Sequence, residues 1–176
     1  QHGEFEEKDS IRFADSLKYT TPEGDVVYGG GGIMPDIFVP LDTAYDSHYL
    51  SQLILKNVVR EYTLEYYNEN REALDALSLD EFIATFNVSL SMLEEVIEMG
   101  EAAGVPFDEQ EFRRSRPLLA NRMKALIARS IWDNNGWYRI MNEYSEIYQE
   151  ALNHFNDAEY LLTAEVLSRE TGIFDE

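Results

Sequence analysis

The spacing of the apolar residues changes near Ser47, and this change restricts most strongly what the chain can fold into. Upstream, short apolar runs at 17–19 and 26–28 flank Pro22-Glu23-Gly24-Asp25, a pattern that predicts a β-hairpin. Downstream, apolar residues recur every four positions, as in an amphipathic helix (Leu50, Ile54, Val58, Tyr62). Strands followed by helices indicate an α+β chain, with a short β portion and a mainly helical remainder.

Capping signals predict where the first helices begin and end. Asp46 or Ser47 caps a helix that carries the four-residue period described above. The run Ser78-Leu79-Asp80-Glu81 is a capping box that opens a short helix ending near Phe86. Ser91 precedes acidic residues in the same way, and its helix closes near Gly104.

The remaining apolar stripes bring the expected total to about five helices. A longer helix starts at Asp108, and Pro117 within it predicts a kink. Asn134-Asn135-Gly136 is a strong break signal. Another stripe follows (Ile140, Tyr144, Ile147, Tyr148, Phe155), and a last helix is expected over 157–169.

A run of four glycines, Gly29 to Gly32, leads through Ile33-Met34-Pro35-Asp36 into the apolar segment 37–41. Glycine is tolerated in series where the chain needs positive φ or a close backbone approach, and Pro35 makes its predecessor extended. The segment is therefore expected to be a shaped connector that feeds a third short strand at 37–41. Three short strands cannot form an independent sheet, so they require another domain, the helices or a second copy.

Residues 1–45 also resemble the end of the catalytic domain in carboxy-terminal processing peptidases, the S41 family of serine peptidases. The resemblance lies in Lys18-Tyr19-Thr20-Thr21-Pro22-Glu23-Gly24, in Val26-Val27-Tyr28 and in Gly32-Ile33-Met34-Pro35-Asp36-Ile37. The segments Gln1–Phe5 and Asp9–Ile11 resemble an insertion of the Bacteroidetes-type branch, and the helical part resembles the C-terminal extension of that branch. The implied division is 1–45 as the end of the protease domain and 46–176 as a helical C-terminal domain.

The resemblance implies a parent serine endopeptidase that hydrolyses peptide bonds through a serine nucleophile and a lysine base, without metal or cofactor. Both of those residues precede the matched region in the family, so we expect no catalytic, cofactor-binding or metal-binding residue in this chain. A polypeptide substrate, reached through the parent protease domain, and a periplasmic or cell-envelope location are also implied. The alternative is a non-catalytic helical module for protein interaction or oligomerisation, and self-association into a homo-oligomer stays open.

The charge of the chain narrows the classes of partner. It has 34 acidic and 14 basic residues, a formal net charge of −20 and no cysteine. Such a field repels nucleic acid and anionic membranes, and no apolar run is long enough to cross a bilayer. We therefore expect no nucleic-acid partner and no membrane span, and disulfide and thiolate chemistry are excluded.

The residue types that carry chemistry stand in unremarkable contexts. None of the lysines is expected to lie buried beside a serine, and the histidines lack a metal-ligand spacing (Lys8, Lys18, Lys56, Lys124; His2, His48, His154). Glu94-Glu95 and Asp108-Glu109 are expected in first turns of helices, where the macrodipole favours carboxylates. The glycine run lacks the Lys-Ser/Thr of a phosphate-binding loop.

The aromatic residues support core packing and, as a second interpretation, a protein interface (Tyr62, Tyr66, Tyr67, Trp132, Trp137, Tyr138, Tyr144, Tyr148). Tyr66-Tyr67 and Trp137-Tyr138 are adjacent pairs, which one helix face cannot bury together. One member of each pair is therefore expected to face outward, where a partner domain or a second subunit could contact it.

Overall fold

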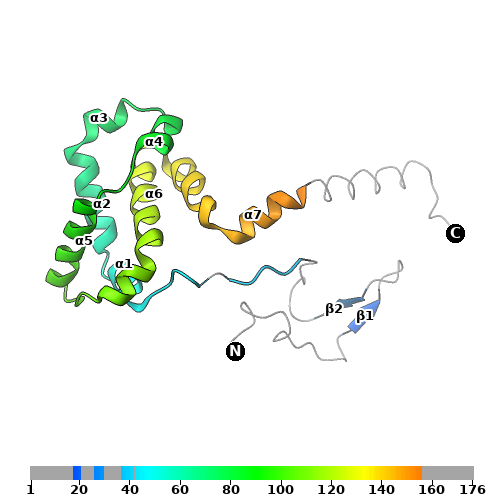
Figure 1. Cartoon of the computed structure of the whole chain (residues 1–176). Helices are drawn as coiled ribbons and strands as arrows, with labels where there is room; N and C mark the ends of the chain where they lie inside the picture. The colour runs from blue at the N-terminus through cyan, green and yellow to red at the C-terminus, as the bar shows by residue number, and fades with distance from the viewer. Residues whose placement is uncertain (1–17, 21–25, 30–36, 42, 156–176) are drawn as a thin grey trace. The chain divides into compact units, whose positions relative to one another are not determined.

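The computed structural model describes residues 18–20, 26–29, 37–41 and 43–155 (Figure 1). The chain separates into two compact units, one of residues 43–145 and the other of residues 1–42 and 146–176. The predicted division into an end of the protease domain (1–45) and a helical C-terminal domain (46–176) stays a prediction. The predicted helix at 157–169 lies outside the described residues.

The predicted β-hairpin is confirmed. Strands β1 (Lys18–Thr20) and β2 (Val26–Tyr28) pair antiparallel, with Lys18 opposite Tyr28 and Thr20 opposite Val26. The predicted third strand is wrong, because residues 37–41 form a bend and irregular chain. Pro40 cannot donate to a sheet ladder, and no strand of the described part pairs with this segment.

The α+β class with a mainly helical remainder is confirmed. The described residues contain seven α-helices, against about five expected, and a short 3₁₀ helix: α1 (His48–Leu55), α2 (Val58–Glu69), α3 (Arg71–Asp75), α4 (Leu79–Thr85), α5 (Leu90–Ala102), α6 (Glu109–Met141), η3 (Asn142–Tyr144) and α7 (Glu146–Asn153). All except α7 lie in the unit of residues 43–145.

Of the three helix starts predicted at a serine, two are confirmed and one is displaced. The Ser47 side chain accepts a hydrogen bond from the Leu50 amide, and Ser78 and Glu81 form the expected capping box. The cap of α5 is Ser89 rather than Ser91, since Ser89 accepts from the Met92 amide. Glycine at 104 follows α5 with φ of +83°, as a helix terminator should.

The first predicted helix is in fact two helices. Asn57 adopts φ of 59° between α1 and α2, in the left-handed region that asparagine tolerates better than most residues. The four-residue period from Leu50 to Tyr62 continues across this break, so apolar spacing could not reveal it. The turn at Asn57 lets both helices bury their apolar faces against α6.

Helix α6 bends near the predicted break signal and not at Pro117. The non-helical residues inside it are Trp132 and Asp133, which directly precede Asn134-Asn135-Gly136. Pro117 removes only the donor to the carbonyl of Arg113, and Arg113 is exposed, so water can replace that bond. The segment after Asp133 folds back onto the first part of α6.

A close contact between backbones fixes this fold-back. A Cβ atom on Gly136 would lie 2.5 Å from the Ala128 carbonyl oxygen and 2.8 Å from its carbon. Buried Asn121 also reaches the returning segment, with its Nδ2 3.5 Å from the Ile140 carbonyl oxygen. Arg139 pairs with Asp80 of α4 at 2.7 Å. Position 136 therefore requires glycine because the Ala128 backbone lies so close to it, and not because of its φ angle.

The core of the helical unit lies between α6 and the helices α1, α2 and α4, with α5 packed on α2 (Figure 1). Fully buried side chains come from each of these helices (Leu53, Val59, Phe82, Val96, Leu119, Met123, Ile127). A series of aromatic contacts runs from Tyr62 through Tyr66 and Phe86 to Phe82. The ring centroids of Phe82 and Trp132 lie 5.3 Å apart.

Polar contacts attach the start of α1 to the first turns of α6. The Glu111 carboxylate accepts from the Tyr49 amide at 2.5 Å, and Ser47 Oγ donates to Ser115 Oγ at 3.0 Å. Arg114 donates to the carbonyl oxygens of Thr43 and Ala44, both at 2.9 Å. Residues 43–47 are thereby fixed to the helical unit.

Candidate functional site: an arginine and tryptophan groove

An open groove of about 480 Å³ lies on the helical unit between α2 and α6. We name it the arginine–tryptophan groove. Its lining comes from the end of α1, the α1–α2 turn, α2 and both parts of α6 (Ile54, Asn57, Val59, Arg60, Thr63, Leu64, Arg122, Leu126, Arg129, Ser130, Trp137).

The bend in α6 brings the tryptophan to the groove. Arg122 and Arg129 are seven residues apart, so two turns of α6 place them on one face. The fold-back after Asp133, allowed by Gly136, returns Trp137 to that face. The guanidinium carbons of Arg122 and Arg129 lie 5.5 and 5.8 Å from the centroid of the Trp137 ring. At these separations both cations interact with the indole π-system.

Among the described residues, the lining of the groove contains three arginines and no acidic residue. Within the described part of the chain, Arg60, Arg122 and Arg129 form no ion pair with a carboxylate. Burial lowers the pKa of Arg122, because taking the guanidinium out of water disfavours its charged form. The groove therefore concentrates positive charge in a chain of strongly negative net charge.

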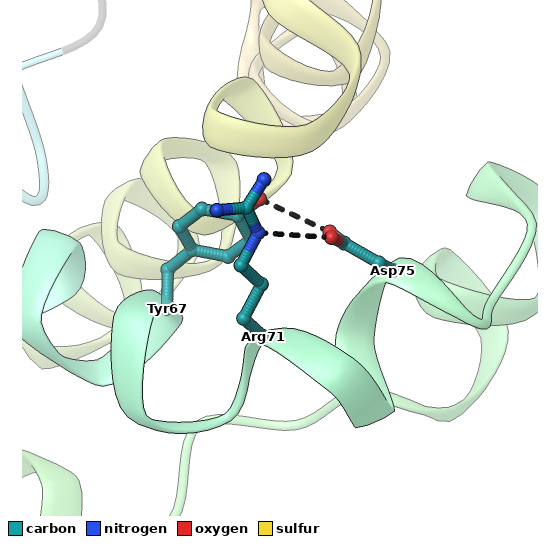
Figure 2. Close-up of polar contacts among 3 residues, drawn as sticks. All are labelled: Tyr67, Arg71 and Asp75. Carbon is teal, nitrogen blue, oxygen red and sulfur yellow. Dashed lines mark hydrogen bonds and ion pairs between the residues drawn. The ribbon is translucent and has the colours of Figure 1, made fainter.

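A second cluster of polar and aromatic side chains, at the α2–α3 junction, has its interactions satisfied internally (Figure 2). Tyr67 Oη donates to Asp75 Oδ1 at 3.0 Å, and Arg71 Nε donates to Asp75 Oδ2 at 3.2 Å. The Arg71 guanidinium also lies 5.9 Å from the Tyr67 ring centroid. Burial and the hydrogen bond to Asp75 raise the pKa of Tyr67. This cluster joins two helices and presents no unpaired charge.

The lysines considered in the sequence do not form a catalytic pair in the described residues. Lys18 and Lys56 are exposed, and Lys8 lies outside the described part. Lys124 differs from the surface charge that we expected. It is half-buried and donates to the Ile83 carbonyl oxygen at 2.7 Å, near the end of α4. Burial lowers the pKa of Lys124, but its partner is a carbonyl and not a hydroxyl nucleophile.

The histidines and carboxylates do not form a metal site among the described residues either. His48 is exposed at the start of α1, His154 lies 3.2 Å from Glu150, and His2 is outside the described part. No group of three metal-ligating side chains occurs among the described residues. Asp108 caps α6 as expected, whereas Glu94-Glu95 lie beyond the first turn of α5, because that helix starts two residues earlier.

The aromatic residues divide between the core and the surface. Tyr62 is buried, and Trp132 packs on Phe82. In the pair at 137–138, Trp137 lines the groove while Tyr138 is 56% exposed, so one member does face outward. Tyr144 and Tyr148 are exposed as well.

The sequence interpretation included Trp137 but missed the arginines. The spacing of seven between Arg122 and Arg129 was a usable signal, since it places both on one face of a helix. Their meeting with Arg60 depends on how α2 packs on α6, and their meeting with Trp137 depends on the bend. Neither is a property of local sequence.

No described helix combines the length and the apolar character that crossing a membrane would require.

Residues 49–133, from α1 to the bend in α6, match the model of a family of unknown function (DUF8443). No curated protein matches the chain. No solved structure matches it either. The matched segment holds every groove residue except Trp137.

Proposed function

We propose that the helical unit is a non-catalytic polypeptide-binding domain that serves a carboxy-terminal processing serine endopeptidase of the S41 type. The observation that carries the binding part is the arginine–tryptophan groove, an open site whose guanidinium groups pair with no carboxylate of the described residues and lie beside a tryptophan. Arginine and tryptophan are the residues that most often dominate the energy of protein contacts.

Support for the peptidase part comes from the sequence of the β portion. The strands β1 and β2 pair antiparallel and come before the Gly32-Ile33-Met34-Pro35-Asp36-Ile37 segment in the sequence, as the resemblance implies. The parent enzyme would hydrolyse peptide bonds through a serine and a lysine that precede the residues matched here. A periplasmic or cell-envelope location is part of the same proposal.

An activity assay tests whether this chain itself hydrolyses peptide bonds. The chain is incubated with an unstructured polypeptide, and the products are followed by mass spectrometry. We expect no turnover, because the reactive residues are proposed to lie elsewhere. Turnover that a serine-directed reagent abolishes would overturn the assignment of the chain as non-catalytic.

A capture assay tests the binding role. Immobilised chain is exposed to a library of unstructured peptides, and a Trp137→Ala variant is compared with Tyr138→Ala. We expect Trp137→Ala to lose captured peptides and Tyr138→Ala to keep them, because only Trp137 lines the groove. Equal capture by both variants would show that the groove does not bind the peptides.

Oligomerisation is a second candidate, and helix α7 favours it. None of its residues is buried, and apolar side chains are exposed on it and just after it (Ile147, Tyr148, Leu152, Phe155). Burying such residues between two copies would stabilise a dimer. Light scattering tests this: a mass of one chain at about 100 μM, a concentration that saturates even weak contacts with micromolar Kd, would exclude it.

A further inference from the structure

We infer that the arginine–tryptophan groove recognises an acidic peptide segment that carries an apolar side chain next to its carboxylates. The inference rests on the proposed polypeptide-binding function and names the chemistry of its ligand. It follows from the charge, the arrangement and the apolar lining of the groove.

The groove arginines differ from other arginines of the same unit in their ion pairing. Arg71, Arg113 and Arg139 each pair with a carboxylate of the chain, at 3.2, 2.6 and 2.7 Å. The three groove arginines have no such partner among the described residues, although the chain has 34 acidic residues. A carboxylate is the group that a guanidinium fork binds most directly, through two parallel N–H···O bonds. The groove therefore holds binding capacity that the described helical unit does not itself use.

The arrangement of the side chains reduces the cost of binding. Arg122 and Arg129 both lie over the Trp137 ring, which restricts their rotamers while leaving guanidinium edges free to donate. Arg122 is half-buried, and its pKa is lowered because no anion compensates for the lost hydration. A ligand carboxylate beside Arg122 would supply that compensation. The site is thus ordered before the ligand arrives, which favours affinity.

The apolar lining distinguishes a peptide from a simple anion. Ile54, Leu64 and Leu126 line the same groove as the arginines, and Leu64 is 50% exposed. An aliphatic or aromatic side chain of the ligand can cover them and the Trp137 ring. A volume of about 480 Å³ accommodates a few side chains of an extended segment. A long nucleic acid is disfavoured more strongly than a short acidic peptide, because repulsion by a chain of net charge −20 grows with the charge of the ligand.

Calorimetric titration with defined peptides tests the inference. The probe is a peptide with blocked ends and the sequence Asp-Glu-Leu-Phe-Glu-Asp, and its matched control replaces each acid by the amide. The whole chain is titrated, with Arg122→Gln and Arg129→Gln as groove variants and Arg113→Gln as the control. Arg129 is exposed, so its replacement leaves the core intact.

We expect the acidic peptide to bind and the amide peptide to bind at least about tenfold more weakly, because hydrogen bonds to charged groups are the stronger ones. Each groove variant should lose about tenfold in affinity, and Arg113→Gln should bind as the unchanged protein does. Arg129→Lys should recover only part of the affinity, because lysine lacks the fork.

Other results would overturn the inference in distinguishable ways. Acidic-peptide binding that neither groove variant weakens would place the ligand elsewhere and leave the proposed polypeptide-binding function standing. Equal affinity for the amide peptide would show that carboxylates are not recognised. Tighter binding of single-stranded RNA or of inorganic phosphate would replace the peptide by another anion. Absence of binding by any peptide, in this titration and in the capture assay, would end both proposals.

Discussion

Replacing Gly136 by alanine tests whether the fold-back of α6 forms the groove. The added Cβ would lie 2.5 Å from the Ala128 carbonyl oxygen and 2.8 Å from the carbonyl carbon. Both are backbone atoms within a helix, so neither can move away as the end of a side chain could. The returning segment must shift instead, and Trp137, the next residue, must shift with it.

Two opposing effects set the size of the change. Alanine is a better helix former than glycine by about 1 kcal/mol, which favours the variant. Overpacking a tight contact costs about 1 to 3 kcal/mol, and contacts with backbone belong at the upper end of that range. The net expectation is a loss of about 1 to 2 kcal/mol. For a unit of this size, that lowers the melting temperature by about 4 to 16 °C.

The assay is thermal unfolding followed by circular dichroism, with Asn135→Ala as the matched control. Asn135 is exposed in the same segment, so its replacement should change stability by less than about 0.5 kcal/mol. Adding Ala128→Gly should not rescue Gly136→Ala, since the two nearest atoms are backbone and remain. A melting temperature for Gly136→Ala at or above that of the unchanged protein would show that the Ala128 backbone leaves room for a side chain at position 136.

Two further predictions concern the ends of helices. Hydrogen bonds from Ser78 lower the pKa of Glu81, so Glu81 stabilises the fold fully above its ordinary pKa of 4.5 and less as pH falls through the lower folded value. Urea unfolding should therefore show a stability advantage over Glu81→Gln at about pH 6 that shrinks toward about pH 3, and a pH-independent difference would contradict the assignment. Arg114→Ala should release residues 43–44 and speed proteolysis there, while Arg113→Ala, which removes only an exposed i,i+4 ion pair, should not. Equal cleavage of both variants would show that Arg114 does not hold the segment.

Local signals predicted much of the fold because they depend on short-range physics. The capping box at Ser78 and Glu81, the cap at Ser47 and the antiparallel pairing of β1 with β2 all follow from neighbouring residues. The split between α1 and α2 was missed, since the apolar period continues across Asn57 and only its φ reverses. A kink was expected at Pro117 and a break at 134–136, and α6 departs from helical geometry at Trp132 and Asp133, directly before the second region.

The candidate site was less predictable for a physical reason. Trp137 was identified as one of an adjacent aromatic pair of which one member should face outward, but the arginines around it come from α2 and from two turns of α6. Their convergence is set by the packing of α2 on α6 and by the close approach of Gly136 to Ala128. The packing of α2 on α6 links residues far apart in sequence, and the approach of Gly136 to Ala128 exists only once the bend at Trp132 and Asp133 has formed.

The most direct test of the account is nuclear magnetic resonance of the arginine and tryptophan side chains during titration with the acidic peptide. We expect the Nε–Hε signals of Arg122 and Arg129 and the indole N–H signal of Trp137 to shift together with one dissociation constant. The signals of Arg71 and Arg113, which pair with carboxylates of the chain, should stay in place. Shifts at Arg71 and Arg113 without shifts at Arg122, Arg129 and Trp137 would contradict the account.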